Sequence, residues 1–152
     1  MTHCWRRGEY EVSTDPGRID LHVVGEFLKR SYWAAERPAD VIERSFENSL
    51  VFGLYQGPRL AGVARVVTDR ATFAWLCDVY IDERDRGQGL SKWLLEVIFS
   101  HPDLQGLRRW LLATKDAHGL YRQYGFQELQ EPVRWMERRG EKALEGPPAP
   151  GS

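Results

Sequence analysis

The hydrophobic positions in the first half of the chain recur first at helical spacing and then in strand-like runs. Apolar residues three and four positions apart predict one helix over residues 20–30 and a second helix that starts at Pro38. Runs of aliphatic and aromatic residues over 50–55, 60–68 and 72–81 are separated by short polar turns. These runs predict three consecutive strands arranged as an antiparallel meander.

The pattern continues through the second half and weakens at both ends of the chain. We expect a helix over residues 90–100, a strand over 108–113, a short helix over 117–124, and strands over 126–129 and 133–138. A short strand is expected over residues 10–13, whereas residues 1–8 are expected to be mobile. The sequence therefore predicts one α+β domain over 1–139, followed by a Pro/Gly-rich, disordered tail over 140–152.

Composition narrows the functional classes. The 21 basic and 22 acidic residues give a net charge of −1, which argues against binding to nucleic acid or to an anionic membrane. Cys4 and Cys77 are the only cysteines, and no Cys/His cluster accompanies them, so we expect neither a disulfide framework nor a metal site. The chain shows no long apolar run and no signal-peptide pattern. We expect a soluble cytoplasmic protein.

A polar turn with two glycines joins the third strand of the meander to the next helix. Gly87 and Gly89 leave backbone N–H groups accessible at a helix N-terminus, where a phosphate is favoured by the helix dipole. Lys92 stands where the dinucleotide-binding pattern requires a third glycine, and the P-loop pattern is not matched either. A tight strand-to-helix connection without a ligand is the alternative interpretation.

Two motifs occur at fixed places in the order of predicted elements: an Arg- and Gly-containing turn from Arg86 to Ser91 before the helix, and the segment from Tyr121 to Phe126 at the end of the short helix. This combination resembles the GNAT superfamily of acetyl-CoA-dependent N-acetyltransferases over about residues 10–138. The family's Q/R-x-x-G-x-G/A pattern is similar to Arg86-Gly87-Gln88-Gly89-Leu90-Ser91, with Ser91 in the last place. A second register, Arg84-x-x-Gly87-x-Gly89, also matches; the first is preferred because it continues directly into the apolar stripe of the helix. The family's Tyr-x-x-x-Gly-Phe pattern is similar to the segment from Tyr121 to Phe126. The chain looks like a small, single-domain bacterial-type member. The resemblance implies a mixed, mostly antiparallel sheet of six to seven strands with about four helices.

The resemblance also implies a binding site for acetyl-CoA as co-substrate. The edge of the meander's last strand would pair with the pantetheine arm, at a point where this strand and the next splay apart. Thr114 stands where the family has an Asn. The residues assigned in this way to acetyl-CoA are Val79, Tyr80, Ile81, Arg86, Gly87, Gln88, Gly89, Leu90, Ser91, Lys92 and Thr114.

Catalytic roles follow from the same resemblance. Tyr121 is similar to the family's tyrosine that protonates the leaving thiolate; the alternative is a core tyrosine. Arg109 occupies the place of a Glu that serves some members as general base, and arginine cannot take that role. Asp78, an acid in an apolar strand, is the first candidate base, with a pKa expected to be raised by its surroundings; the alternative is a structural Asp. The next candidates for the general base are Asp116 and His118, and a water relay from the amine to solvent is a further possibility.

The acceptor is expected to be a primary amine on a small molecule, acetylated by direct transfer in a ternary complex. Tyr32, Trp33 and Trp75 are candidate walls of a pocket for an apolar or cationic group; Tyr32 and Trp33 alternatively cap the core. Three other functions stay open: acetylation of a protein or peptide amine, a non-catalytic acyl-CoA sensor, and a different nucleotide-binding α/β domain. A homodimer would fit the family, in which dimers are common.

Overall fold

The structure, a computed structural model, describes residues 1–140 of the 152. It contains two compact units, Met1–Ala113 and a second that begins at Thr114, and each is described by itself. Beyond residue 140, the predicted tail lies outside the described residues. No helix in the described part of the chain is long and apolar enough to cross a membrane.

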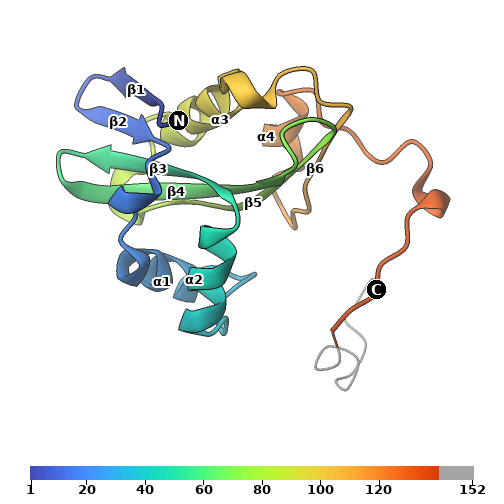
Figure 1. The fold of residues 1–152 in the computed structure, drawn as a ribbon, viewed down its shortest axis with the longest axis horizontal. Helices are drawn as coiled ribbons and strands as arrows, with labels where there is room; N and C mark the ends of the chain where they lie inside the picture. Colours follow the sequence, from blue (N-terminus) through green and yellow to red (C-terminus); the bar gives the residue numbers. More distant parts are fainter. Residues whose placement is uncertain (141–152) are drawn as a thin grey trace. The chain divides into compact units, whose positions relative to one another are not determined.

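A six-stranded mixed sheet forms the centre of the first unit (Figure 1). The strands lie in chain order, and every neighbouring pair is antiparallel except β5 and β6, which are parallel. Helices α1 and α2 cover one face of the sheet and α3 covers the other. The elements are β1 Cys4–Arg7, β2 Tyr10–Ser13, α1 Leu21–Lys29, α2 Ala39–Glu47, β3 Leu50–Gln56, β4 Arg59–Thr68, β5 Phe73–Ile81, α3 Leu90–Ser100 and β6 Arg109–Leu111.

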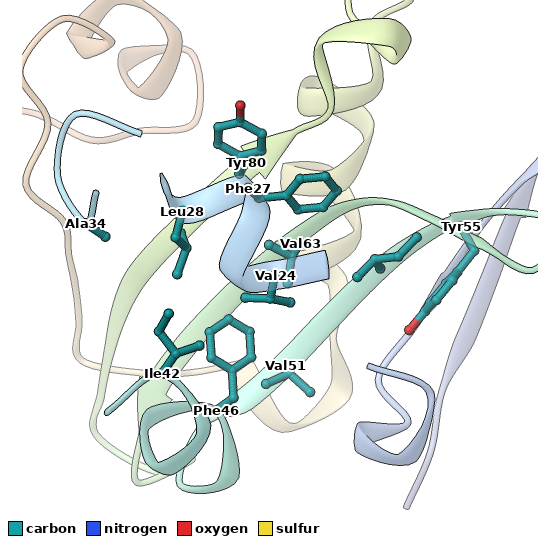
Figure 2. Close-up of a cluster of buried hydrophobic side chains, with 11 residues drawn as sticks. Val24, Phe27, Leu28, Ala34, Ile42, Phe46, Val51, Tyr55, Val63 and Tyr80 are labelled. Carbon is teal, nitrogen blue, oxygen red and sulfur yellow. The ribbon is translucent and has the colours of Figure 1, made fainter. Parts of the chain in front are cut away.

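Helix α1 forms where the sequence supplies both a side-chain cap and an apolar stripe, whereas α2 starts after Pro38 without a side-chain cap. The Asp20 side chain accepts hydrogen bonds from two N–H groups in the first turn of α1, at 3.0 and 3.3 Å. Val24 on α1 and Ile42 and Phe46 on α2 then point toward the strands and join one hydrophobic cluster (Figure 2). This cluster fixes both helices, and the segment that connects them, against β3, β4 and β5.

A bulge in β5 sets the geometry of the strand at Asp78. Cys77 pairs with Arg65 and Tyr80 pairs with Val63, so β5 has one residue more than β4 between these two pairs. Asp78 adopts a left-handed backbone with φ of 50°, which Asp tolerates better than most residues. The bulge therefore marks the end of β5 that precedes the Gly-rich turn.

Strand β5 loses its partner on the β6 side before it reaches this bulge. The parallel pairing runs only from Phe73 with Arg109 to Trp75 with Leu111. In the described chain, no strand pairs with the β6-side edge of β5 beyond Trp75. The β6-side edge of β5 therefore has no strand partner at the bulge, and the splaying of the two strands stays a prediction.

Two predictions about the ends of the described chain are wrong. Residues 1–8 contain β1, which pairs with β2 along its whole length, because Trp5 packs near Phe52 and His101. The segments 126–129 and 133–138 do not form strands, and residues 132–134 form a 3₁₀ turn instead. Strand propensity alone does not create a strand without a neighbour to pair with.

Two histidines meet beneath β1. His101 is 1% exposed, and its ring lies 4.8 Å from that of His3. Its Nδ1 accepts a hydrogen bond from Asp103 N at 3.0 Å, so the neutral ring carries its proton on Nε2, which has no partner among the described residues. Burial lowers the pKa of His101, with a further contribution from His3. The ring is held neutral.

We expect His101 to make folding sensitive to acid. A histidine with a lowered pKa takes up protons in the unfolded chain first, so the free energy of unfolding falls as pH drops below about 6.5. Urea unfolding at pH 7 and at pH 5.5 measures the difference. His101→Asn keeps a capping acceptor but no titratable ring, and it should reduce this pH dependence. Exposed His22→Asn is the control. An unchanged pH dependence in His101→Asn would contradict the assignment.

Candidate acetyl-CoA site

The Gly-rich turn is built from a 3₁₀ turn, Glu83–Asp85, followed by two glycines. Gly87 and Gly89 have φ of 82° and 76°, a left-handed backbone that favours glycine. Gly89 is the N-cap of α3, and its carbonyl accepts the first helical hydrogen bond, from Trp93 N at 3.1 Å. The N–H groups of the first turn of α3 have no acceptor within the helix, as at any helix N-terminus. Local backbone geometry therefore prepares this turn for an anion.

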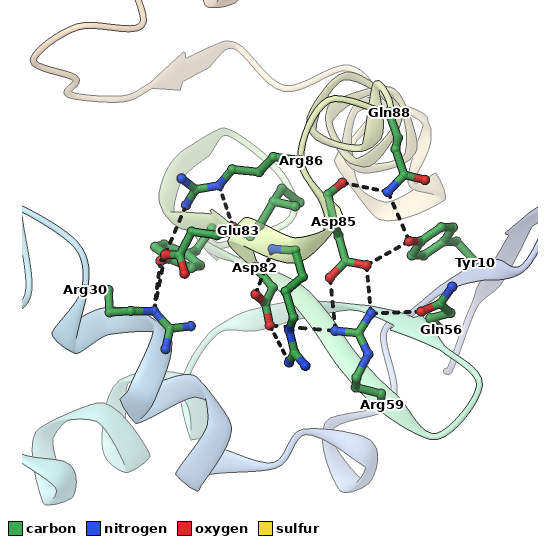
Figure 3. A network of polar contacts seen from close by, with 12 residues as sticks. Tyr10, Arg30, Gln56, Arg59, Asp82, Glu83, Asp85, Arg86 and Gln88 are labelled. Atoms are coloured by element: carbon green, nitrogen blue, oxygen red, sulfur yellow. Dashed lines mark hydrogen bonds and ion pairs between the residues drawn. The ribbon is translucent and has the colours of Figure 1, made fainter.

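A buried carboxylate holds the turn in place (Figure 3). Asp85, 2% exposed, accepts two hydrogen bonds from Arg59 at 2.7 and 3.0 Å and one from Tyr10 at 2.8 Å. The contact with Arg59 lowers the pKa of Asp85 although burial opposes it. Gln88 Nε2 donates to the carbonyl of Asp85 at 3.1 Å. The turn is thereby tied to β2 and β4 and is preorganised.

Cationic side chains surround the outside of the turn. Glu83 forms ion pairs with Arg30 at 3.3 Å and Arg86 at 3.8 Å and accepts a hydrogen bond from Tyr80 (Figure 3). Arg7 on β1 donates to the carbonyl of Gly89 at 3.4 Å. The sequence pattern identified Arg86 but neither Arg7 nor Arg30, because both reach the turn from distant segments. These guanidiniums are suited to a phosphorylated ligand.

The residues assigned to the strand edge divide between core and backbone roles. The Tyr80 ring is buried and stacks on Phe27 at 5.2 Å between ring centroids, so its side chain belongs to the core. Val79, Tyr80 and Ile81 nevertheless lie on β5 beyond its last pairing with β6, where a strand edge can pair with an extended ligand. The Ile81 carbonyl accepts a hydrogen bond from Arg86 Nε at 2.9 Å. Their cofactor contacts stay predictions, as do those of Leu90, Ser91 and Lys92 at the start of α3.

The Asp78 carboxylate is the centre of a second polar cluster. Its side chain is 2% exposed and accepts hydrogen bonds from Trp33 Nε1 at 2.7 Å, Arg37 Nη1 at 2.8 Å and Arg65 Nε at 2.9 Å. Burial alone would raise the pKa of Asp78, but the Arg37, Trp33 and Arg65 contacts outweigh it, and the pKa is lowered. The expected raised pKa is wrong. An ion-paired carboxylate of low proton affinity is a poor general base.

The predicted acceptor residues are exposed. Tyr32 and Trp33 are 56% and 40% exposed and pack edge to face, with ring centroids 5.1 Å apart. Trp75, 47% exposed, lies on β5 where the pairing with β6 ends. The structure thus joins Trp33 to Asp78 directly. The sequence analysis did not identify Arg37 or Arg65, because neither arginine belongs to a recognisable sequence motif.

The second unit contains the remaining candidates. Helix α4, His118–Arg122, carries Tyr121, whose ring packs near that of Phe126 at 5.9 Å between centroids. The Thr114 hydroxyl accepts a hydrogen bond from Ala117 N at 3.1 Å, which is a capping role. Asp116 and His118 are exposed. The catalytic role of Tyr121 and the cofactor role of Thr114 stay predictions.

The comparisons with known proteins agree with this fold. A family model described as an acetyltransferase (GNAT) domain matches residues 47–128, a range that includes parts of both units. A Gibberella zeae protein named "Putative acetyltransferase FG08082" is 32% identical, with 84% of each chain covered.

Two solved structures extend the comparison. A Xanthomonas campestris protein described as belonging to the GNAT family is 41% identical, with a TM-score of 0.84, and the match covers 90% of this chain and 97% of that one. A Clostridium acetobutylicum structure, described as a predicted acetyltransferase with acetyl-CoA, has a TM-score of 0.63 at 17% identity, covering 91% of this chain and 96% of that one, and shows the shared fold alone. The chain belongs to the GNAT family of acetyltransferases.

Proposed function

We propose that this acetyltransferase moves the acetyl group of acetyl-CoA directly to a primary amine of a small molecule in a ternary complex. The observation that carries the proposal is the open edge of β5 beside a glycine turn at the N-terminus of α3. The turn would bind the diphosphate through backbone N–H groups, and the strand edge would pair with the pantetheine amides. The acetyl-CoA bound by the fold neighbour from Clostridium acetobutylicum supports the same choice of co-substrate.

The reaction needs an activated amine and a stabilised leaving group. The neutral amine nitrogen attacks the thioester carbonyl, the C–S bond breaks, and Tyr121 donates a proton to the departing thiolate. The proton that the nitrogen loses on forming the amide restores the Tyr121 hydroxyl, directly or through water. An alkyl amine of ordinary pKa must first lose a proton, which costs roughly 4.6 kcal/mol at pH 7. Asp78 is unsuited to accept this proton because its arginine partners stabilise the carboxylate. The remaining candidates for accepting the amine proton are Asp116, His118 and a water relay to solvent.

A non-catalytic acyl-CoA sensor is the second candidate function. Two observations favour it: Arg109 stands where some family members have a Glu base, and Asp78 is held as an ion-paired anion. Such a protein would keep the phosphate turn and the strand edge while lacking an efficient route for the amine proton. Binding and turnover therefore have to be measured separately.

Acetyl-CoA is expected to raise the melting temperature, whereas NAD and ATP should not. A ligand present at a hundredfold excess over its Kd stabilises the folded state by about 2.7 kcal/mol. Release of free CoA thiol, measured with a panel of primary amines, then tests turnover. Thermal stabilisation without thiol release on any amine would favour the sensor. The absence of stabilisation at millimolar acetyl-CoA would contradict the proposal.

A further inference from the structure

The cluster around Asp78 contains more positive than negative charge. Arg37 and Arg65 both form ion pairs with this single carboxylate, and no other described carboxylate pairs with either of them. Trp33 adds a neutral donor to the same carboxylate. The arrangement therefore has a surplus of one positive charge, and its members come from β4, β5 and the segment between α1 and α2.

Both arginines keep hydrogen-bonding capacity for a ligand. Arg37 uses Nη1 for Asp78, and Arg65 uses Nε for Asp78 and Nη1 for the Ser49 hydroxyl at 3.2 Å. A guanidinium is a planar fork with further N–H donors in fixed directions. The two side chains are only 23% and 12% exposed, so the surplus charge is partly removed from water. A partly desolvated, incompletely paired cation favours the binding of an anion.

The position of this charge relates it to the reaction. Asp78 lies at the β5 bulge, next to Val79 on the open edge where the thioester is expected. Asp78, which contacts both arginines, has a left-handed backbone, and such strain is often retained at functional sites. The exposed Tyr32 and Trp33 rings adjoin the same cluster. An acceptor bound beside the thioester would thus meet both the surplus charge and the aromatic rings.

Building on the proposed function, we propose that the acceptor is a primary amine that also carries an anionic group, a carboxylate or a phosphate, bound by Arg37 and Arg65. The Tyr32 and Trp33 rings contact the organic part of the same molecule. A second cation on the acceptor is disfavoured, because the surplus charge repels it. The sequence analysis considered either a cationic or an apolar group for the aromatic pocket. The proposal drops the cationic group and keeps the apolar group.

Matched amines that differ only in the anionic group test the proposal. Phenylalanine is compared with phenethylamine for a carboxylate, and O-phosphoethanolamine with ethanolamine for a phosphate. With saturating acetyl-CoA, we expect kcat/KM to be about tenfold or more higher for the anionic member of at least one pair. The pair that shows the larger ratio identifies which anion the site takes.

Variants connect the preference to the cluster. Arg37→Gln should remove most of the advantage of the anionic amine, so that the ratio of kcat/KM between the two members of a pair falls toward one. Arg37→Lys should retain part of the advantage of the anionic amine, because lysine keeps the positive charge but lacks the planar guanidinium. Arg44→Gln on α2, an exposed arginine outside the cluster, is the control and should leave the ratio unchanged. Arg37 is preferred to Arg65 because it is more exposed and less tied to the fold.

The outcomes separate this inference from the proposed function. Acetyl transfer without preference for anionic amines, or an equal loss on both members of a pair in Arg37→Gln, overturns the inference alone. If no amine is acetylated, the melting temperature with each amine in the presence of CoA decides: stabilisation by the anionic member that Arg37→Gln abolishes supports the anion site. Equal shifts for both members, or none, overturn it. The change in melting temperature caused by acetyl-CoA tests independently whether the protein binds acetyl-CoA, as the proposed function requires.

Discussion

Asp78→Ala is expected to lower the free energy of unfolding by about 4 kcal/mol, because it leaves two partly buried guanidiniums without their carboxylate. It also places alanine at a φ of 50°, which costs about 1 kcal/mol more than it costs Asp. Asp78→Asn keeps the shape and tolerates the left-handed backbone, so its smaller loss isolates the missing charge. Urea unfolding of the three proteins at pH 7 measures both effects.

Acid titration provides an independent check on the same carboxylate. The pKa of Asp78 is lowered in the folded chain, so its contribution to stability is present above the unfolded value, near pH 3.9, and is lost as pH falls through the folded pKa. Asp78→Asn should flatten this part of the stability profile. Asp103→Asn, which breaks an exposed ion pair with Arg70, is the matched control and should cost less than about 1 kcal/mol. Equal losses in Asp78→Asn and Asp103→Asn would show that the cluster contributes little to folding.

The part of the site that the sequence predicted is the part that rests on local chemistry. Gly87 and Gly89 are needed wherever a chain turns from a strand into a helix with positive φ, and that requirement is visible in a few letters. The apolar stripe from residue 90 onward fixed the start of α3 for the same reason. Helices α1 and α2 and strands β3, β4 and β5 likewise follow from spacing and turns.

What the sequence could not predict depends on distant partners. From the sequence, Asp85 would be taken for an exposed turn residue. In the structure it is buried because Arg59 on β4 and Tyr10 on β2 donate hydrogen bonds to it. The sequence predicts that Asp78 is a buried acid, but the direction of its pKa shift depends on Arg37 and Arg65, which are 41 and 13 positions away. Burial and pairing shift a carboxylate pKa in opposite directions, and only the structure shows which dominates.

The two wrong predictions at the ends of the chain have a related cause. A strand needs a neighbour as well as a suitable sequence. Strand β1 has a weak hydrophobic alternation but pairs with β2. Residues 133–138 have a stronger strand pattern, but no strand lies next to them in the described structure. Pattern predicts a strand most reliably in the middle of a sheet, where neighbours are assured on both sides.

Replacement of Tyr121 by phenylalanine is expected to reduce kcat about a hundredfold while leaving the affinity for acetyl-CoA within about twofold, because only the hydroxyl is lost. The phenylalanine ring can keep the contact with Phe126. Tyr124→Phe, three residues further on, is the matched control and should retain kcat. Steady-state turnover with the best amine, together with the acetyl-CoA thermal shift, measures both quantities.

The size of this effect distinguishes two roles for the hydroxyl. Proton transfer from an ordinary phenol to an ordinary thiolate is uphill by roughly 2 kcal/mol, so full transfer requires the site to favour it. A hydroxyl that only donates a hydrogen bond to the sulfur would contribute about tenfold, whereas a general acid contributes about a hundredfold or more. Full kcat in Tyr121→Phe would make Tyr121 a packing residue, and the thiolate would then have to leave unassisted or take its proton from water.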